Sequence, residues 1–256
     1  MEGLKGKTFI VTGGGSGIGA ATVLRLLSEG AQVVAGGTRA EGLAQTRDQA
    51  GALADNLLTA QFDLRDEASI ESFVAKATQS FGRLDGVANV AAAVRPDLMS
   101  RDLGVDTLDV DVWTEVMRTN LIGTGIVIRE SLPAIVAAGG GSIVNVSSAG
   151  PFLGGPAPTA YSASKHALHS LTRHTARTWG KQNVRANAVA PGAVLTEAAA
   201  KVMTDEATEE FLQGTALPRL GQPDDLASML AFLLSDEGSW ITGQILSVDG
   251  GLTMRE

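Results

Sequence analysis

Tyr161 is the one tyrosine of the chain, and Lys165 follows it four positions later. If this stretch is helical, both side chains lie on one face, because residues four apart are neighbours on a helix. A phenol titrates at about pH 10 in water, and a nearby cation stabilises its phenolate form. The pair could therefore pass a proton to or from a substrate oxygen. Alone, the same spacing is also common among unrelated neighbours on helices.

Ser148 could complete such a site. The sequence "SIVNVSS" (142–148) contains a β-branched run typical of a buried strand, and Ser148 comes just past its end. We expect its hydroxyl at the carboxyl edge of a sheet, where it can hold a substrate oxygen beside Tyr161.

A glycine-rich stretch, "VTGGGSGIGAA" (11–21), follows the first apolar run and opens a helical pattern. Glycines at such a turn let backbone N–H groups approach a pyrophosphate, and the helix N-terminus favours negative charge. A P-loop is excluded because no Lys-Ser/Thr pair follows the glycines. A tight strand-to-helix turn without a ligand is the alternative. The residues expected to cradle a dinucleotide are Gly13, Gly15, Ser16, Gly17, Ile18 and Gly19.

The end of the second apolar run bears on which dinucleotide is bound. An acidic residue there would bind the ribose 2′-hydroxyl of NAD and repel the 2′-phosphate of NADP. The chain has Gly37 at that place, followed by Thr38 and Arg39. We therefore expect NADP, with NAD as the alternative if Arg39 simply points to solvent.

These residues must be positioned by a sheet. Seven short β-branched runs alternate with longer helical patterns, which is typical of repeated βαβ units. The middles of the runs are apolar without strict alternation, as in a parallel sheet buried on both faces. The expected fold class is α/β: a single Rossmann-like, doubly wound domain over residues 1–256, with a seven-stranded, mainly parallel sheet and helices on both faces. The runs are 8–13, 31–37, 57–64, 84–91, 141–148, 184–192 and 243–251.

Two segments interrupt this alternation. Residues 93–112 are rich in aspartate and show neither a strand nor a long helix. They could bind a metal, but a solvated loop is favoured, and we expect no metal in the chemistry. Residues 193–217 form a helical stretch that we interpret as a substrate lid, because ligands sit beyond the carboxyl ends of the strands, where such excursions cluster.

Composition excludes several classes of function. A formal net charge of −8 argues against nucleic acid as a partner, since phosphate binding needs clustered lysine and arginine. The absence of cysteine excludes disulfides and thiolate catalysis. The apolar stretch "LASMLAFLL" is far shorter than the ~20 residues that span a bilayer, and no apolar signal segment opens the sequence. We expect no membrane association and a cytoplasmic location.

With these residues in place, the chain resembles the classical short-chain dehydrogenase/reductase family over essentially its whole length. The motifs that carry the resemblance are "TGGGSGIG" (12–19), "FDL" (62–64), "NVAA" (89–92), "TNLIG" (119–123), "NVSS" (145–148), "YSASK" (161–165), "APGAVLT" (190–196) and "VDGG" (248–251). The resemblance implies an NAD(P)-dependent enzyme that interconverts secondary alcohols and ketones. It implies Tyr161 as acid/base and Lys165 on the nicotinamide ribose and as the cation of the tyrosine. It also implies Ser148 on the substrate oxygen and Asn120 in a water-mediated proton relay.

The resemblance implies further cofactor contacts. Asp63 and Leu64 resemble the adenine contacts, and Asn89 is expected beside the adenosine ribose. The segment that resembles the grip on the nicotinamide amide contains Pro191, Gly192, Val194 and Thr196. The chain departs from the family at Val90 and Ala92, where Asn and Gly are usual, so a methyl group could crowd the cofactor there.

Substrate and assembly are defined less closely. Residues 149–155 and the lid residues 197–213 would wall a pocket for a small-to-medium apolar alcohol or ketone, while steroids, sugars and acyl thioesters stay open. A homotetramer is expected from the resemblance and from an apolar helix face. That face contains Ala163, Ala167, Leu168, Leu171 and Thr175. A non-catalytic dinucleotide-binding sensor or scaffold is the alternative function, against which the Ser148, Tyr161 and Lys165 set argues.

Overall fold

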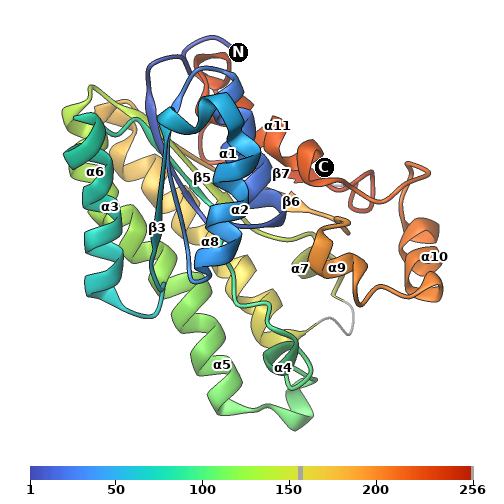
Figure 1. Ribbon diagram of the computed structural model, residues 1–256. Helices are drawn as coiled ribbons and strands as arrows, with labels where there is room; N and C mark the ends of the chain where they lie inside the picture. The colour runs from blue at the N-terminus through green and yellow to red at the C-terminus, as the bar shows by residue number, and fades with distance from the viewer. Residues whose placement is uncertain (155–157, 255–256) are drawn as a thin grey trace.

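Seven strands form one sheet in the order β3-β2-β1-β4-β5-β6-β7, and all neighbours in it pair in parallel. The computed structural model describes residues 1–154 and 158–254 (Figure 1). The strands are β1 (Thr8–Thr12), β2 (Gln32–Gly37), β3 (Leu57–Gln61), β4 (Gly86–Asn89), β5 (Gly141–Val146), β6 (Val184–Pro191) and β7 (Ile245–Val248). The expected doubly wound α/β fold is therefore confirmed.

Helices cover both faces of the sheet (Figure 1). The helices are α1 (Gly17–Ser28), α2 (Ala40–Ala50), α3 (Glu67–Phe81), α4 (Pro96–Met99), α5 (Val110–Met117), α6 (Thr124–Ala137), α7 (Gly150–Leu153), α8 (Thr159–Trp179), α9 (Glu197–Ala200), α10 (Asp205–Gly214) and α11 (Pro223–Leu234). A π-helical stretch, η3 (Arg118–Gly123), joins α5 to α6. The short 3-10 turns are η1 (Gly51–Asn56), η2 (Val105–Thr107), η4 (Gly180–Gln182) and η5 (Asp236–Gly238).

Strand β1 shows why the strands are apolar throughout. Val11 packs on one face with Val23 of α1 and Leu230 of α11, whereas Ile10 packs on the other face with Phe73 of α3. Successive side chains of a strand point to opposite faces, so a sheet covered on both sides needs apolar residues at consecutive positions. Helices α1, α2 and α11 cover one face, and α3, α6 and α8 cover the other.

The order of the strands creates a crevice. From β1 the chain builds outward through β2 to β3 and then returns to place β4 on the opposite side of β1. Helical connections therefore leave in opposite directions at the carboxyl ends of β1 and β4, and this is where doubly wound sheets bind ligands. Several predicted runs extended too far in this direction: residues 62–64, 147–148 and 249–251 lie beyond the strands.

One helical run is longer than the apolar stretch "LASMLAFLL" (226–234). Val110–Ala137, which spans α5, η3 and α6, has the length and composition of a membrane-crossing helix, with a mean hydropathy of 1.2. Half of this apolar window is buried inside the protein, and the run packs against α3 and α8. Helices in a protein core can have the same length and apolar composition, so these two properties are weak evidence that the run spans a membrane.

Candidate active site

The glycine stretch forms a tight turn between β1 and α1. Gly13 and Gly17 have φ angles of +74° and +51°, a left-handed conformation that other residues rarely adopt. A Cβ at Gly19 would lie 2.0 Å from the carbonyl oxygen of Gly13, so only glycine fits there. Ser16 precedes α1 without a side-chain capping bond, and Ile18 packs against the core. The first N–H groups of α1 therefore remain available to an anion.

The residues expected to select the cofactor lie beside this turn. A Cβ at Gly15 would come within 3.0 Å of the amide nitrogen of Leu43, so the first turn of α2 packs on the glycine stretch. Thr38 and Arg39 directly precede α2, and the exposed side chain of Arg39 makes no capping bond to that helix. A Cβ at Gly37 would meet no heavy atom within 4 Å. This corner thus combines a cation, a hydroxyl and open space.

The side-chain oxygen of Asn89 is buried, and no described residue donates a hydrogen bond to it. Its Nδ2 donates to Oδ1 of Asn145 at 2.9 Å, and Nδ2 of Asn145 donates to the Thr172 hydroxyl at 2.9 Å. Within the described residues, Oδ1 of Asn89 has no hydrogen-bond partner. Buried polar atoms are normally satisfied, so a ligand hydroxyl is a fitting donor here. The orphaned oxygen and the glycine turn together fit an adenosine diphosphate with its ribose.

Asp63 and Leu64 lie just beyond β3. Arg65 donates to the two carboxylate oxygens of Asp63 at 3.0 and 2.7 Å, and these bonds hold the pKa of Asp63 below its usual value. Leu64 is buried, and its carbonyl oxygen lies only 2.4 Å from the place of a Cβ at Gly123. Asp63 is therefore ionised and suited to accept a bond from an amino group such as that of adenine.

The segment Pro191–Thr196 lies against the glycine turn. A Cβ at Gly192 would be 3.0 Å from the Cα and Cβ atoms of Asp249, so the chain runs tightly past the end of β7. At the other end, Cγ2 of Thr196 lies 3.0 Å from the place of a Cβ at Gly17. Two segments that the sequence singled out separately are thus brought together.

The Val90 and Ala92 departures are accommodated without loss of register. The pairing of β1 with β4 continues to Asn89, and the N–H of Val90 donates to the Thr12 hydroxyl at 3.0 Å. The Val90 side chain packs against the core on the side of α1. Ala92 is half-buried.

Tyr161 and Lys165 lie on α8, as predicted, but their electrostatics differ from expectation. The ammonium of Lys165, which is 2% exposed, donates to the carbonyl oxygen of Val146 at 2.7 Å and lies 5.7 Å from the centre of the Tyr161 ring. Burial lowers the pKa of Lys165 to about 8. Burial also raises the pKa of Tyr161 to about 12, against the effect of a hydrogen bond with Ser148. In the chain by itself the pKa of Tyr161 is therefore raised and not lowered, because desolvation outweighs the hydrogen bond with Ser148.

Ser148 is correctly placed next to the phenol. It follows the end of β5, its hydroxyl accepts the N–H of Gly150 at 3.1 Å, and it hydrogen-bonds the Tyr161 side chain. A hydroxyl and a phenol that share a hydrogen bond can both contact one substrate oxygen. The sequence-based placement of both groups at the carboxyl edge of the sheet agrees with this geometry.

Asn120 lies in the π-helical stretch, a distortion that is frequent at functional sites. Its Oδ1 accepts the N–H of Ala93 at 2.7 Å, and its Nδ2 donates to the Ser164 hydroxyl at 3.0 Å. Ser164 in turn donates to the carbonyl oxygen of Tyr161 at 2.7 Å. Asn120 therefore ties the loop after β4 to the helix that carries Tyr161.

Asp102 is a residue near the site that the sequence did not reveal. It was included in a loop expected to be solvated, but it is only 4% exposed, and its carboxylate accepts the N–H groups of Ala160 and Tyr161, each at 2.8 Å. The solvated-loop expectation is therefore wrong at this position. One signal was available: Pro158 precedes α8 and has no side-chain acceptor for its first turn.

A buried histidine lies behind the site. Nε2 of His169 is 2.6 Å from the Ser147 hydroxyl, which also donates to the carbonyl oxygen of Lys165 at 3.0 Å, and the ring of Phe152 stacks on His169. These contacts make His169 part of the packing that holds β5 against α8. Over the ranges 1–154 and 158–254, no group of three or more His, Cys, Asp or Glu side chains could hold a metal ion.

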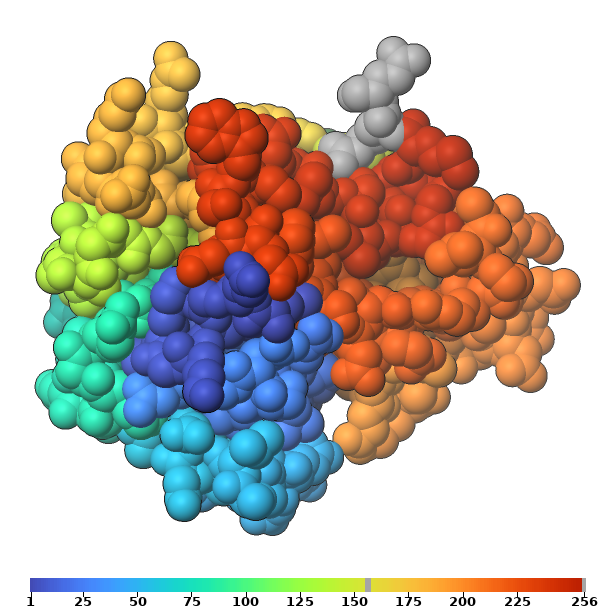
Figure 2. All heavy atoms as spheres, turned by 90° about the horizontal axis from the view of Figure 1, so that it is seen from above, coloured from blue at the N-terminus to red at the C-terminus, as the bar shows by residue number. Residues whose placement is uncertain are grey.

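The expected lid consists of α9 and α10, two short helices without a buried residue. Val202 is 72% exposed and Phe211 is 40% exposed. In both views the segment stands at the outer edge of the molecule (Figures 1 and 2). Of the pocket wall expected at 149–155, residue 155 lies outside the described residues.

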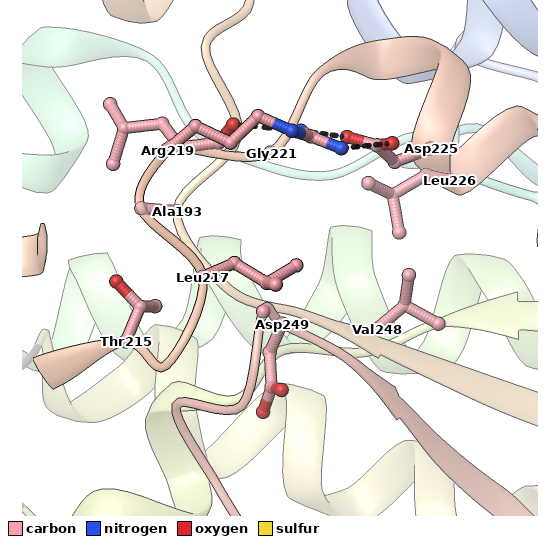
Figure 3. A pocket seen from close by; sticks show the side chains of 11 residues that line it. Ala193, Thr215, Leu217, Arg219, Gly221, Asp225, Leu226, Val248 and Asp249 are labelled. Carbon is pink, nitrogen blue, oxygen red and sulfur yellow. Dashed lines mark hydrogen bonds and ion pairs between the residues drawn. The ribbon is translucent and has the colours of Figure 1, made fainter.

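A separate cavity of about 130 Å³ lies where the connection from α10 to α11 passes the end of β7 (Figure 3). Leu217, Leu226 and Val248 line it, and the ion pair between Arg219 and Asp225 lies at one side. None of the four predicted catalytic residues lines this cavity. It lies next to the segment Pro191–Thr196, where Val194 and Gly221 form an isolated β-bridge.

Comparison with known proteins adds independent observations. A family model described as enoyl-(acyl carrier protein) reductase matches residues 13–253. The chain is 35% identical over 254 residues to the 7α-hydroxysteroid dehydrogenase of Bacteroides fragilis, covering 99% of this chain and 97% of that protein. It is 36% identical over 251 residues to the 3-oxoacyl-(acyl-carrier-protein) reductase of Thermotoga maritima, covering 98% and 99% of the two chains. It superposes on levodione reductase with a TM-score of 0.89 at 32% identity, covering 96% and 97%.

Proposed function

Because this chain belongs to the classical short-chain dehydrogenase/reductase family, we propose that Asn120, Ser148, Tyr161 and Lys165 are its catalytic group. The protein is an NAD(P)-dependent oxidoreductase that acts on CH–OH groups and the corresponding carbonyls. The observation that carries the proposed roles is the hydrogen bond between the half-buried Tyr161 side chain and Ser148, with the ammonium of Lys165 5.7 Å from the centre of the tyrosine ring. No observation favours the binding-only alternative.

The reaction pairs a hydride with a proton. When bound, the nicotinamide supplies or accepts the hydride at the carbon of the substrate. In the reducing direction, Tyr161 gives its proton to the substrate oxygen, which Ser148 holds by a hydrogen bond. The raised pKa of Tyr161 keeps the phenol protonated at neutral pH, which suits a proton donor. In the oxidising direction, the same phenol must first lose its proton, and Lys165 supports the phenolate.

The residues at the end of β2, Gly37, Thr38 and Arg39, favour NADP as the cofactor. Arg39 is exposed beside the glycine turn, Thr38 adds a hydroxyl, and no carboxylate occupies position 37. A 2′-phosphate would find a cation and a hydrogen-bond donor here, without the repulsion that an acidic residue would cause. The remaining contacts proposed for the dinucleotide are those of the glycine turn, Asp63, Leu64, Asn89 and the segment Pro191–Thr196.

The substrate that we propose is an uncharged, apolar secondary alcohol or ketone. Val202 and Phe211 present apolar surface from the lid, and Met203, which follows Val202 in sequence, is half-buried. Helix α10 also carries exposed carboxylates, which repel anionic substrates. These are Asp205, Glu206, Glu209 and Glu210. One of the relatives described above is named for a hydroxysteroid, that is, a steroid that carries a hydroxyl group.

Assembly and location complete the proposal. We infer a homotetramer in the cytoplasm, where its nicotinamide cofactor is available. One argument for self-association is weaker than expected, because Leu168 and Thr175 of the proposed helix face are already buried within the chain. Ala163, Ala167 and Leu171 remain half-buried on that helix.

A panel of alcohols and ketones assayed with both cofactors tests the function. We expect NADPH to be consumed with apolar cyclic or branched ketones, and carboxylate-bearing analogues of the same size to react more slowly. Cofactor binding without turnover across the panel would instead support a sensor.

A further inference from the structure

Helix α8 lacks an N-cap of its own. The residue before its first turn is Pro158, which has no side-chain acceptor, and the structure gives it no capping bond. The hydroxyl of Thr159, the first helical residue, donates to the carbonyl oxygen of Leu103 at 2.7 Å. The N–H groups of Ala160 and Tyr161 are the second and third of the helix, which an N-cap side chain normally satisfies.

Asp102 fills this role from another part of the chain. Its Oδ1 accepts the N–H of Ala160, and its Oδ2 accepts the N–H of Tyr161, 59 residues away in sequence. Within the described residues, Asp102 forms no ion pair with a lysine or arginine. A buried carboxylate is costly unless its charge is compensated, and the positive end of a 21-residue helix provides that compensation.

The loop around Asp102 is anchored to the same helix. Leu98 of α4 and Val112 and Val116 of α5 pack in one apolar cluster with Ala160. The chain is therefore anchored to α8 both before and after Asp102, and this anchoring holds the carboxylate in place. The peptide groups of Tyr161 are also fixed at both ends, because its N–H donates to Asp102 and its carbonyl oxygen accepts the Ser164 hydroxyl.

We propose that Asp102 is a positioning residue for Tyr161: it caps the catalytic helix and fixes where the phenol stands relative to Ser148. The inference rests on the proposed role of Tyr161. Displacement of a proton donor by about 1 Å can lower a rate ~10²-fold, even when binding elsewhere is unchanged. Loss of the cap should therefore lower kcat more than it weakens cofactor binding.

Asp102→Ala and Asp102→Asn test this. We expect kcat to fall at least tenfold in both variants, with the Kd for NADPH changed less than threefold and faster amide exchange at Ala160 and Tyr161. Asp106→Asn, in an exposed part of the same loop, is the matched control and should keep the parent values. Unchanged kcat and unchanged exchange at Tyr161 would overturn the proposal.

Restoring the cap locally separates positioning from general instability. In Asp102→Ala/Pro158→Asp, the new side chain can accept the second and third N–H groups directly, so kcat should recover most of its loss. If Asp102→Ala does not fold, the double variant should fold and be active. A double variant that is folded but remains as slow as Asp102→Ala would contradict the proposal. Amide exchange reports the cap even if Tyr161→Phe shows that the tyrosine is not the proton donor, so the two failures are distinguishable.

Discussion

The ammonium of Lys165 donates a 2.7 Å hydrogen bond to the carbonyl oxygen of Val146, at the end of β5. The bond places a cation inside the protein, where burial lowers its pKa from 10.5 to about 8. Burial raises the pKa of Tyr161 from 10.0 to about 12. Desolvation thus favours the neutral form of both side chains. Protonated Lys165 and the Tyr161 phenolate, the charged forms proposed for catalysis, are therefore held in the folded chain at a cost to its stability.

The first prediction concerns this cost. The unfolded chain binds the Lys165 proton up to about pH 10.5, whereas the folded chain releases it at about pH 8. Between these values the unfolded state holds more protons, so the contribution of Lys165 to the free energy of unfolding rises with pH. The difference in this free energy between the parent and Lys165→Met should rise by about 1.4 kcal/mol per pH unit in the middle of that range.

Urea unfolding of both proteins at several pH values between 7 and 10 measures this difference. Subtracting Lys165→Met removes the titration of all other groups that the two proteins share. A difference that stays flat across the range would show that Lys165 is not desolvated in the folded chain.

Tyr161→Phe should fold and bind cofactor but lose nearly all turnover. The ring packing remains, while the proton donor next to Ser148 is removed. General acid–base groups typically contribute ~10²–10⁴-fold, so kcat should fall by that order with any accepted ketone. Steady-state kinetics and cofactor titration measure both parts, and a Phe variant within about threefold of the parent would mean that another group supplies the proton.

The sequence predicted a site residue correctly where the local backbone geometry or the spacing along the chain determines which residue type is needed. Gly13 and Gly19 were predictable because a left-handed φ angle and a 2.0 Å approach to a carbonyl oxygen exclude any side chain. Ser148 was placed at the carboxyl edge because it follows a predicted buried strand, whereas Asn89 was assigned only through the family resemblance. The helical spacing also correctly placed Tyr161 and Lys165 on one helix.

The sequence could not supply partners that lie far apart in the chain. Asp102 was indistinguishable from the exposed aspartates around it, because its partners are backbone groups 58 and 59 residues away. The i, i+4 spacing likewise placed Lys165 near Tyr161 but did not show that its ammonium meets Val146. Burial, which decides the direction of both pKa shifts, depends on the packing of whole elements.

Gly37→Asp should reverse the cofactor preference. A Cβ at this position meets no heavy atom within 4 Å, and the φ angle of Gly37 is not positive, so aspartate fits without strain. Its carboxylate would bind the 2′-hydroxyl of NADH and repel the 2′-phosphate of NADPH. Fluorescence titration of each variant with both nucleotides measures the preference.

Gly37→Asn is the matched control, because it adds nearly the same shape without charge. It should weaken NADPH binding much less than Gly37→Asp does. Tighter binding of NADH than NADPH by the unmodified protein would contradict the assignment of Arg39 and Thr38 to the phosphate.

The protein should be a tetramer, with a mass in solution near four times the 26.3 kDa of one chain. Trp240 is 97% exposed, and a large aromatic side chain left in water is more often covered by a partner. Light scattering at micromolar concentration measures the mass. A mass of one chain would refute the assembly, and Trp240→Ser should lower the mass if this side chain lies in an interface.

The last prediction concerns the lid, residues 197–213. Neither α9 nor α10 buries a residue, and Val202 and Phe211 expose apolar surface that has no evident use in the chain alone. Closure of the lid over a bound substrate would bury both side chains and exclude water from the path of the hydride. Gly192 and Gly214 flank the segment and can absorb the rotation of the backbone.

Hydrogen exchange distinguishes a moving lid from a fixed wall. Backbone amides of residues 197–213 should exchange fast without ligands and markedly slower with cofactor and a substrate analogue, because closure would shield amides that are now near solvent. The buried helix α11 serves as an internal control and should exchange slowly in both states. Equal exchange of the lid in the two states would mean that this stretch does not close, and the substrate pocket would then have to be sought around residues 93–112, next to the cap that Asp102 provides.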